Sequence, residues 1–277
     1  MKYILPLFWV AIQAVVIARE PLPDKLAVLT FDDSVKSHYT IARPILKKHG
    51  FGATFFITEG WDFATNKEHY MSWEEIKALH EDGFEIGNHT RDHMSVTPAS
   101  ITKLDEQLSA IEARCKSYGI TPPVSFAWPG NAITPDAFPI LHAHGIKFAR
   151  RGGSPEQPYK LGKGVAYEPG KDHPLLIPTA ADARPFWKAE MFTELVLQVK
   201  SGQVAVLQFH GVPDVAHPWV SSVADNFSAY MDWLHTNGYT VIAMRDLEKY
   251  VDLSELPEDP MLIMEQRKQA IAASDNK

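Results

Sequence analysis

Residues 26–33 read Leu-Ala-Val-Leu-Thr-Phe-Asp-Asp, and this stretch decides the fold. Its first six residues are almost continuously apolar, which is typical of a parallel strand that is buried on both faces. Two carboxylates follow directly. Neighbouring residues on a strand point to opposite faces, so Asp32 and Asp33 can serve one site only if the strand ends there. In parallel barrels that end of a strand faces the catalytic mouth.

Similar short runs of apolar and β-branched residues alternate with amphipathic helical stretches, which indicates a parallel α/β architecture. The residues Ser72-Trp73-Glu74-Glu75 predict the start of one helix, because they form a capping box. Seven or eight strand–helix units would close into a barrel. Strands are expected at residues 26–31, 53–58, 84–88, 124–128, 147–149, 175–179, 204–209 and 240–244.

The chain divides into three parts by composition. Residues 1–18 carry Lys2 and then a long apolar run, and we predict a cleaved signal peptide there. An uncleaved membrane anchor is the alternative, although the run is shorter than the ~20 residues that a span needs. Residues 19–254 are expected to be the catalytic domain, and residues 255–277 a polar tail or surface helix. The sequence thus predicts a secreted or periplasmic protein, with a membrane-anchored one as the alternative.

Charge and cysteine content exclude several classes of protein. The net charge is −7, and the Lys and Arg residues are scattered, so nucleic acid is not expected as a partner. We expect no stable membrane partner either, and the oligomeric state stays open. Cys115 is the single cysteine, so no disulfide can form within the chain. It falls on an apolar helical face, where a small core residue is expected.

The second group of polar residues is Asn88-His89-Thr90-Arg91-Asp92-His93, at the end of the third predicted strand. Two histidines four residues apart can share a face of a helical turn and chelate one metal ion. With one carboxylate they form a set that leaves coordination positions open for water and substrate, which distinguishes a catalytic site from a structural one. This spacing also arises by chance, but chance is a poor explanation beside the two aspartates at another strand end.

Four motifs resemble those of the polysaccharide deacetylases, the family 4 carbohydrate esterases. Thr-Phe-Asp-Asp-Ser at 30–34 is similar to the first motif, and His-Thr-Arg-Asp-His at 89–93 is similar to the second. Phe-Ala-Trp-Pro-Gly-Asn at 126–131 resembles the third, and Leu-Gln-Phe-His at 207–210 resembles the last. The first two motifs are highly specific, and the order matches over residues 26 to about 245.

The resemblance implies a distorted (β/α) barrel with seven or eight parallel strands and one divalent metal. It assigns Asp33, His89 and His93 as metal ligands, Asp32 as the general base and His210 as the general acid. The metal is usually zinc, although nitrogen and oxygen ligands also accept cobalt, nickel or manganese. Such an ion polarises an acetyl carbonyl and activates water. The activity implied is hydrolysis of N- or O-acetyl groups on a poly- or oligosaccharide.

Three departures from the family pattern concern the pocket. Ala127 stands where many members have an arginine that orients the base, and Arg150 or Arg151 could replace it. The alternative for these arginines is an exposed surface pair. Gln208 stands where a leucine is frequent and, by alternation, shares the face of His210, so the acetyl pocket is expected to be more polar. Gly130 stands where a tyrosine is frequent, which leaves a backbone amide available to the oxyanion.

Substrate binding is assigned to a further set of residues near these motifs. Tryptophan rings can stack on sugars, although a tryptophan can equally belong to the core. Two other functions stay open: hydrolysis of a small ring amide or formamide on the same fold, and binding of carbohydrate without catalysis. The predicted substrate-binding residues are Trp128, Pro129, Gly130, Arg150, Gln208 and Trp219.

Overall fold

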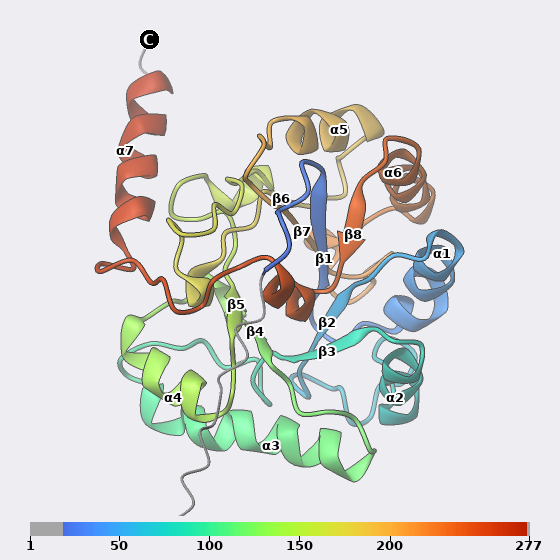
Figure 1. Ribbon diagram of the computed structural model, residues 1–277. Helices are drawn as coiled ribbons and strands as arrows, with labels where there is room; N and C mark the ends of the chain where they lie inside the picture. The colour runs from blue at the N-terminus through green and yellow to red at the C-terminus, as the bar shows by residue number, and fades with distance from the viewer. Residues whose placement is uncertain (1–18, 276–277) are drawn as a thin grey trace, which may run out of the picture.

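The computed structural model describes residues 19–275 (Figure 1). The predicted signal peptide lies outside the described residues. All strand pairs within the described part are parallel. Seven strands follow one another in the order β5-β4-β3-β2-β1-β7-β6 and curl into a half-barrel, and β8 pairs with β1. The α/β class and the distorted barrel are therefore confirmed. The strands are β1 Leu26–Phe31, β2 Thr54–Ile57, β3 Glu85–Asn88, β4 Ser125–Ala127, β5 Phe148–Arg150, β6 Ala181–Asp182, β7 Ala205–Phe209 and β8 Thr240–Ile242.

Strand β1 is the centre of the sheet. It pairs with β7 from Ala27 to Phe31, while its other edge is shared between β8 and β2. All six of its residues are buried. Leu29 and Phe31 belong to the core that contains residues of the outer helices, whereas Val28 belongs to a second core inside the half-barrel. Packing on both faces explains why this strand is apolar throughout.

The helices surround the sheet (Figure 1). Helix α2 begins at the predicted capping box: Glu75 N–H donates to Ser72 Oγ, and Ser72 N–H donates to the Glu75 carboxylate. The α-helices are α1 Arg43–His49, α2 Trp73–Glu81, α3 Leu104–Ser117, α4 Phe138–Ala143, α5 Ala189–Leu197, α6 Ala224–Thr236 and α7 Leu262–Asp275. The short turns are the π-helix His38–Ala42 and the 3-10 turns Ile101–Lys103, Pro129–Asn131, Pro135–Ala137, Tyr159–Leu161, Pro174–Leu176, Pro218–Val220 and Met244–Lys249.

The predicted strand at 175–179 is wrong. Pro174 opens a 3-10 turn instead, and His173 Nδ1 caps it by accepting from Leu175 N–H. Only Ile177 makes a parallel bridge, to Arg150 of β5, and the strand of this region is β6 further along the chain. A proline lacks the amide hydrogen that a sheet ladder needs and favours the first turn of a helix, which explains the difference.

Two features concern the remainder of the chain. Helix α7 is attached to the body through Arg267, whose guanidinium donates to both carboxylate oxygens of Asp172 at 2.6 and 2.9 Å. Among the described residues, no helix has the length and apolar character required to cross a membrane. Cys115 is fully buried, and burial raises the pKa of its thiol to about 12, which agrees with the predicted core role.

Candidate metal centre and active site

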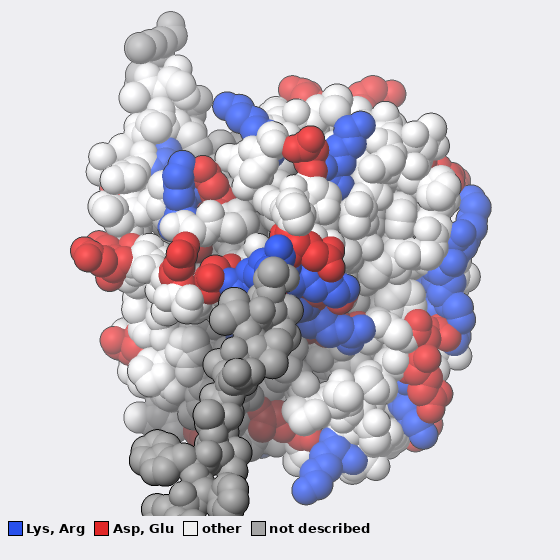
Figure 2. Space-filling model, in the orientation of Figure 1, with Lys and Arg blue, Asp and Glu red and all other residues white. Residues whose placement is uncertain are grey.

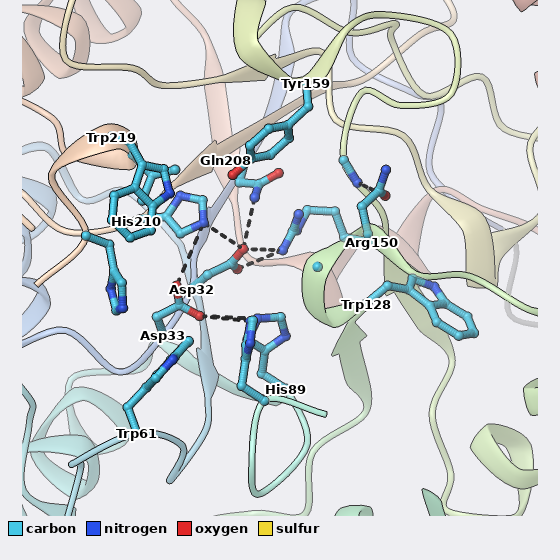
Figure 3. A pocket seen from close by; sticks show the side chains of 16 residues that line it. Asp32, Asp33, Trp61, His89, Trp128, Arg150, Tyr159, Gln208, His210 and Trp219 are labelled. Carbon is cyan, nitrogen blue, oxygen red and sulfur yellow. Dashed lines mark hydrogen bonds and ion pairs between the residues drawn. The ribbon is translucent and has the colours of Figure 1, made fainter. Parts of the chain in front are cut away.

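The polar residues predicted from different parts of the chain meet at the carboxyl ends of the strands (Figure 3). They line a pocket of about 340 Å³ that receives side chains from the segments after β1, β2, β3, β4, β5 and β7. Parallel strands place all their carboxyl ends on one side, so residues distant in sequence converge there. The pocket is lined by Asp32, Asp33, Trp61, His89, His93, Trp128, Gly130, Asn131, Arg150, Gly152, Tyr159, Gln208, His210, His217, Trp219 and Val220.

The two aspartates reach the same pocket because β1 ends at Phe31, as the sequence required. Asp33 and Ser34 both adopt left-handed backbone conformations, with φ of 74° and 56°. Ser34 Oγ donates to the carbonyl of Thr58 and accepts from its amide, at 2.8 and 2.9 Å. The turn is thereby fixed to the end of β2, and both carboxylates face the pocket.

The three predicted metal ligands lie together. Asp33 Oδ1 is 3.4 Å from His89 Nε2 and 3.5 Å from His93 Nε2, and the three ligand atoms all lie within 4.8 Å of one another. Four-coordinate zinc with bonds of ~2.0–2.1 Å has ligand atoms about 3.4 Å apart, so the two distances from Asp33 suit a tetrahedral ion. Asp33 Oδ1 is buried and has no hydrogen-bond partner, which is the condition of an atom ready to bind a cation.

The loop that carries the histidines is not a helical turn, contrary to the prediction. Residues 89–93 follow β3 as an irregular loop in which Thr90 and His93 have left-handed φ values of 59° and 52°. Thr90 N–H donates to Asn88 Oδ1, and Thr90 Oγ1 accepts from Met94 N–H, which holds this loop. The two rings still converge, with centroids 4.8 Å apart.

Hydrogen bonds and charges prepare these side chains for a metal. His89 Nδ1 lies 2.8 Å from the carbonyl of Ala127, which leaves Nε2 free to bind an ion. Burial and the neighbouring His89 lower the pKa of His93 to about 4, so His93 is neutral at pH 7. Burial alone would raise the pKa of Asp33, but the neighbouring His89 and the charge of His210 bring it below its usual value. An ionised carboxylate and neutral imidazole are the forms that bind metals.

Asp32 is held by a buried arginine from another strand. Arg150 Nη2 donates to Asp32 Oδ1 at 2.7 Å and to Oδ2 at 2.6 Å, and both residues are at least 98% buried. Gln208 Nε2 adds a third hydrogen bond to Oδ2 at 3.0 Å. Arg151 instead pairs with Glu156 at 2.5 Å inside the protein. Neither arginine is therefore the exposed surface pair that was the alternative.

His210 lies between two groups of acids. Its Nε2 is 3.9 Å from the nearest oxygen of Asp32 and of Asp33, while its Nδ1 is 3.8 Å from Asp182 Oδ1. Asp182 is itself paired with Arg184 at 2.6 and 2.7 Å, and burial raises the pKa of Asp182 above its usual value. The sequence analysis missed Asp182, although an aspartate directly at a strand end is the same signal that marked Asp32.

His38 also belongs to this region, although the sequence analysis did not identify it. It is fully buried, and its Nε2 lies 3.0 Å from the carbonyl of His210. Its ring contacts those of Phe31 and Phe55 at centroid distances of 5.4 and 5.5 Å. His38 begins the short π-helix His38–Ala42, in which it is buried together with Ala42.

The predicted substrate-binding residues divide into two groups. Arg150, Gln208, Gly130 and Trp219 line the pocket, and Trp219 is 61% exposed. Trp128 also reaches the pocket wall but belongs mainly to the core: it is 2% exposed, and its indole N–H donates to Leu175 O at 2.9 Å.

Pro129 is buried and is not one of the described residues that line the pocket. The sequence analysis missed Trp61 and Tyr159, which lie on the pocket rim and are 51% and 49% exposed. Trp61 lies in a loop and Tyr159 begins the single 3-10 turn Tyr159–Leu161, and neither segment is long enough to carry a periodic signal that could have located them.

Residues 19–149, which contain β1 to β4 and all but the last residue of β5, match the sequence profile of the family described as polysaccharide deacetylase. This match assigns the segment, just under half of the chain, to the polysaccharide deacetylase family. A peptidoglycan-N-acetylglucosamine deacetylase of Bacillus cereus is 28% identical over 119 residues, which are 43% of this chain and 52% of that protein. Across the curated relatives, the matched segments cover between 12% and 52% of the relatives' own length.

Solved structures of the family share the fold. A family 4 acetyl xylan esterase from Clostridium thermocellum, in complex with a cobalt ion, superimposes with a TM-score of 0.55 and 22% identity, over 86% of this chain and 96% of that one. A family 4 pseudoenzyme from Bacillus anthracis superimposes with a TM-score of 0.53 and 17% identity, over 86% and 70%. At these identities the likeness concerns the fold alone, so activity must be argued from the site.

Proposed function

We propose that this member of the polysaccharide deacetylase family is a metal-dependent hydrolase that removes acetyl groups from a carbohydrate. The observation that carries the proposal is the arrangement of Asp33, His89 and His93 around one point, with Asp32 beside them. Three protein ligands leave positions open for water and substrate. Zinc is the metal we propose, because the separations suit a tetrahedral ion and the donors are one oxygen and two nitrogens.

The side chains around the ligand set supply the proton transfers. A bound divalent cation contributes Lewis-acid polarisation of the acyl carbonyl and of the attacking water. Asp32 accepts a proton from that water, and Arg150 fixes its carboxylate in one orientation through two hydrogen bonds. Oδ2 of Asp32 accepts from both Arg150 and Gln208, which leaves Oδ1 as the oxygen with a lone pair free for the proton.

His210 is positioned to return a proton to the departing amine or alcohol. Its Nε2 faces the carboxylate pair, and its Nδ1 faces Asp182 on the other side. Carboxylates therefore flank the ring on both sides. His38 Nε2 forms a hydrogen bond with the backbone carbonyl of His210, which fixes the backbone that carries this side chain.

Two other functions must be weighed against this one. A carbohydrate-binding protein without catalysis is a realistic alternative, since a pseudoenzyme shares the fold. Here, however, the base, its arginine, the three ligands and the imidazole acid all occupy one pocket. Hydrolysis of a small ring amide or formamide uses the same groups. The exposed Trp61, Tyr159 and Trp219 at the rim favour a carbohydrate, because aromatic faces contact sugar rings well.

Acetate release tests the proposal. Purified protein would be stripped with a chelator, reloaded with zinc, cobalt, nickel or manganese, and incubated with N-acetylated and O-acetylated oligosaccharides. We expect about one ion per chain and acetate release only in the loaded protein. His93→Ala should lose both metal and activity, whereas the control His144→Gln should keep both, because His144 lies between Asp105 and Glu112 outside the pocket. Full metal occupancy in a His89→Ala, His93→Ala double variant would contradict the ligand assignment.

Export is the second part of the proposal. We propose that residues 1–18 direct the chain out of the cytoplasm, since a short positive start and an apolar run precede the domain. An acetylated polysaccharide of a cell wall or of plant material would meet the enzyme there. Expression of the full chain, followed by N-terminal sequencing of the exported protein, tests this: a mature protein starting near residue 19 is expected, and a start at Met1 on membranes would indicate an anchor.

A further inference from the structure

A further histidine of the pocket is paired with a buried carboxylate and has no part in the proton transfers described above. His217 lines the pocket in the loop after β7, and Asp214 lies three residues before it with a fully buried side chain. His217 Nδ1 is 3.4 Å from Asp214 Oδ2, and the backbone N–H of His217 donates to Asp214 Oδ1 at 2.8 Å. The Asp214–His217 pair thus joins the pocket wall to the interior.

The loop that carries this pair is fixed by its own hydrogen bonds. Ser222 N–H donates to the carbonyl of Gly211 at 2.9 Å, which closes the loop at its base. Asp214 N–H donates to Ser221 Oγ at 2.9 Å. A side chain at Gly211 would come within 2.5 Å of the Asp214 Cα, so the chain packs tightly against itself here. Asp214 is therefore held behind His217 before any ligand arrives.

Two aromatic rings hold the imidazole of His217 at the pocket. Its centroid is 4.8 Å from that of Trp61 and 5.4 Å from that of Trp219. The ring of Trp61 in turn contacts the proposed metal ligand His93, at a centroid distance of 4.5 Å. A single indole thus lies between His217 and the ligand set. A group bound at His217 would therefore belong to the acetylated sugar itself or to the sugar next to it.

The pair presents a hydrogen-bond donor to the pocket. A carboxylate only accepts, so Nδ1 of His217 carries the proton that points to Asp214. Among residues 19–275 no group forms a hydrogen bond with Nε2, and 12% of the side chain is exposed. The hydrogen bond to Asp214 raises the pKa of His217 above its usual value against the effect of burial, and the charges of Asp33 and Asp62 act in the same direction. Nε2–H of the imidazolium is therefore available to a ligand.

The other cationic side chains of the pocket already have partners. Arg150 is the single Arg or Lys among the described residues that line the pocket, and both its donated bonds go to Asp32. His210 has carboxylates on both sides. On the face shown in Figure 2, Lys and Arg lie mixed with Asp and Glu, so the described part of that face offers no continuous cationic track for a polyanion. An anion on the substrate would therefore meet His217 as the cation that is open to the pocket.

A charged imidazole suits an anion better than it suits a sugar hydroxyl. A neutral ring is sufficient for a hydroxyl, because its Nε2 can accept from the O–H group. A carboxylate behind the ring favours the imidazolium, whose hydrogen bonds to ionised acceptors are roughly twice as strong as neutral ones. Phosphate groups are usually held by several donors or by a guanidinium fork, whereas a single N–H suits a carboxylate.

We infer that the Asp214–His217 pair binds a carboxylate of the substrate, with His217 Nε2–H as the donor and Asp214 as the buried partner that orients the ring. The substrate is then an acidic glycan, with its carboxylate on the acetylated sugar or on the neighbouring one. This inference rests on the proposed function, because it names the substrate class of the same pocket. A lactyl ether of an amino sugar and a uronic acid both carry this chemistry, and the experiment separates them.

Matched pairs of substrates that differ in charge test the inference. Each pair is an acidic saccharide and its primary carboxamide, which keeps the size of the carboxylate and removes the charge. One acid contains N-acetylmuramic acid linked to N-acetylglucosamine, and the other contains glucuronic acid linked to O-acetylated xylose. The pH would be about 6, where even an ordinary imidazole with a pKa of ~6.5 is largely charged.

Two quantities would be measured for each pair. The zinc-loaded full chain gives kcat/KM for acetate release. Calorimetry gives the affinity in the same chain carrying Asp32→Asn, which slows turnover during the measurement. We expect at least one acid to bind about tenfold more tightly than its carboxamide, because an ionised acceptor strengthens the hydrogen bond from the imidazolium.

The ratio of acid to carboxamide is the readout that a purely structural role of the pair would leave unchanged. His217→Gln should lower this ratio to about one, because glutamine keeps a donor and loses the charge. Asp214→Asn should lower it as well. His217→Arg should retain most of it, since a guanidinium keeps the charge and stacks on aromatic rings. The matched control is His144→Gln, because His144 also pairs with carboxylates, Asp105 and Glu112, but lies outside the pocket.

Thermal unfolding shows which variants fold, and His217→Gln is the decisive one because the side chain of His217 is partly exposed. Equal affinity for acid and carboxamide in both pairs, without any change at His217, would overturn the inference. An unaltered ratio in a folded His217→Gln protein would overturn it as well. A His217-dependent preference in one pair alone would support the inference and identify the source of the carboxylate.

The test also distinguishes this inference from the proposed function. Acetate release from acid and carboxamide with equal kcat/KM, in a ratio unaltered by His217→Gln, would leave the hydrolase standing and refute the carboxylate site. A His217-dependent preference for the acid in binding, without acetate release by any metal-loaded form, would leave the carboxylate site standing and refute the hydrolase.

Discussion

Arg150 and Asp32 are separated by 118 residues, yet one guanidinium nitrogen donates to both oxygens of the carboxylate at 2.7 and 2.6 Å. Arg150 ends β5, and its partner in the sheet ladder is Ala127 of β4. Directly paired residues of neighbouring strands project from the same face of a sheet. Arg150 thus lies beside Ala127, the position at which many family members have an arginine. It reaches Asp32 from the neighbouring strand.

This relationship predicts that the arginine can be moved from position 150 to position 127 and still orient Asp32. Arg150→Ala should lower kcat about 10²-fold, since a misplaced catalytic group commonly costs that much. The double variant Ala127→Arg, Arg150→Ala should recover part of the loss. Steady-state kinetics on an acetylated oligosaccharide measures both, and thermal unfolding shows whether each variant folds. Wild-type kcat in a folded Arg150→Ala protein would mean that the ion pair has no part in catalysis.

Asp32 and Asp33 are adjacent but are expected to respond differently to the same substitution. Asp32→Asn should keep the metal and lose turnover ~10²–10⁴-fold, because it removes the general base. Asp33→Asn should weaken metal binding itself, because Asp33 Oδ1 faces both ligand histidines. Metal analysis after dialysis and acetate release would be measured on the same samples. The opposite pattern would show that base and ligand are interchanged.

His210 should matter most where the leaving group needs a proton. His210→Ala is expected to lower kcat/KM ~10²–10⁴-fold for an N-acetyl substrate, because its amine is a poor leaving group when no general acid protonates it. An aryl acetate leaves without a proton and should be cleaved at nearly the wild-type rate. Equal losses on the amide and on the aryl ester would make His210 a structural residue or a substrate ligand.

The buried His38 predicts how stability changes with pH. Burial lowers the pKa of His38 from 6.5 to about 4, so the folded protein keeps this ring neutral where the unfolded chain takes up a proton. The free energy of unfolding should therefore fall as the pH drops from 6.5 to 4, by up to about 1.4 kcal/mol per pH unit. The stabilisation is fully present above pH 6.5.

Denaturant unfolding of metal-free protein between pH 7.5 and 4.5 measures this dependence. His38→Gln should be less stable than the wild type at pH 7.5 and should show a shallower decline with falling pH. His142→Gln, at an exposed position of α4, is the control and should follow the wild-type curve. An identical slope in His38→Gln would mean that other groups cause the acid sensitivity.

Local pattern made most of the fold predictable. The range predicted for β1 is the observed one, and β2, β3, β4, β7 and β8 lie within their predicted ranges, because apolar runs between turn residues are a strong signal. The Asp33, His89 and His93 set could be predicted for a related reason: Asp33 and His89 lie within two residues of the ends of β1 and β3, and His93 lies four residues after His89. What the pattern could not supply was the conformation of residues 89–93, where left-handed backbone at Thr90 and His93 replaces the helical turn.

Long-range packing determined what the sequence left open. Whether Arg150 or Arg151 met Asp32 depended on the direction in which each side chain leaves the end of β5, and on Glu156 binding the other guanidinium. Trp61 lies in a loop and Tyr159 in a single 3-10 turn, and their place at the rim follows from contacts with His93 and Arg184 that no sequence spacing predicts. Loop side chains are positioned by tertiary structure, so single-sequence patterns do not locate them.

In this chain the arginine that orients the base lies on β5 and not on β4. This difference affects how inactive members of such a family are recognised. A test that inspects only the alignment column of Ala127 would count this chain among the degenerate relatives, because the column lacks its arginine. A test in space, asking whether a guanidinium lies within hydrogen-bond distance of the first aspartate, would count it among the complete ones. Genomic inventories of pseudoenzymes that rely on motif columns will therefore contain false positives wherever neighbouring strands can supply the same group.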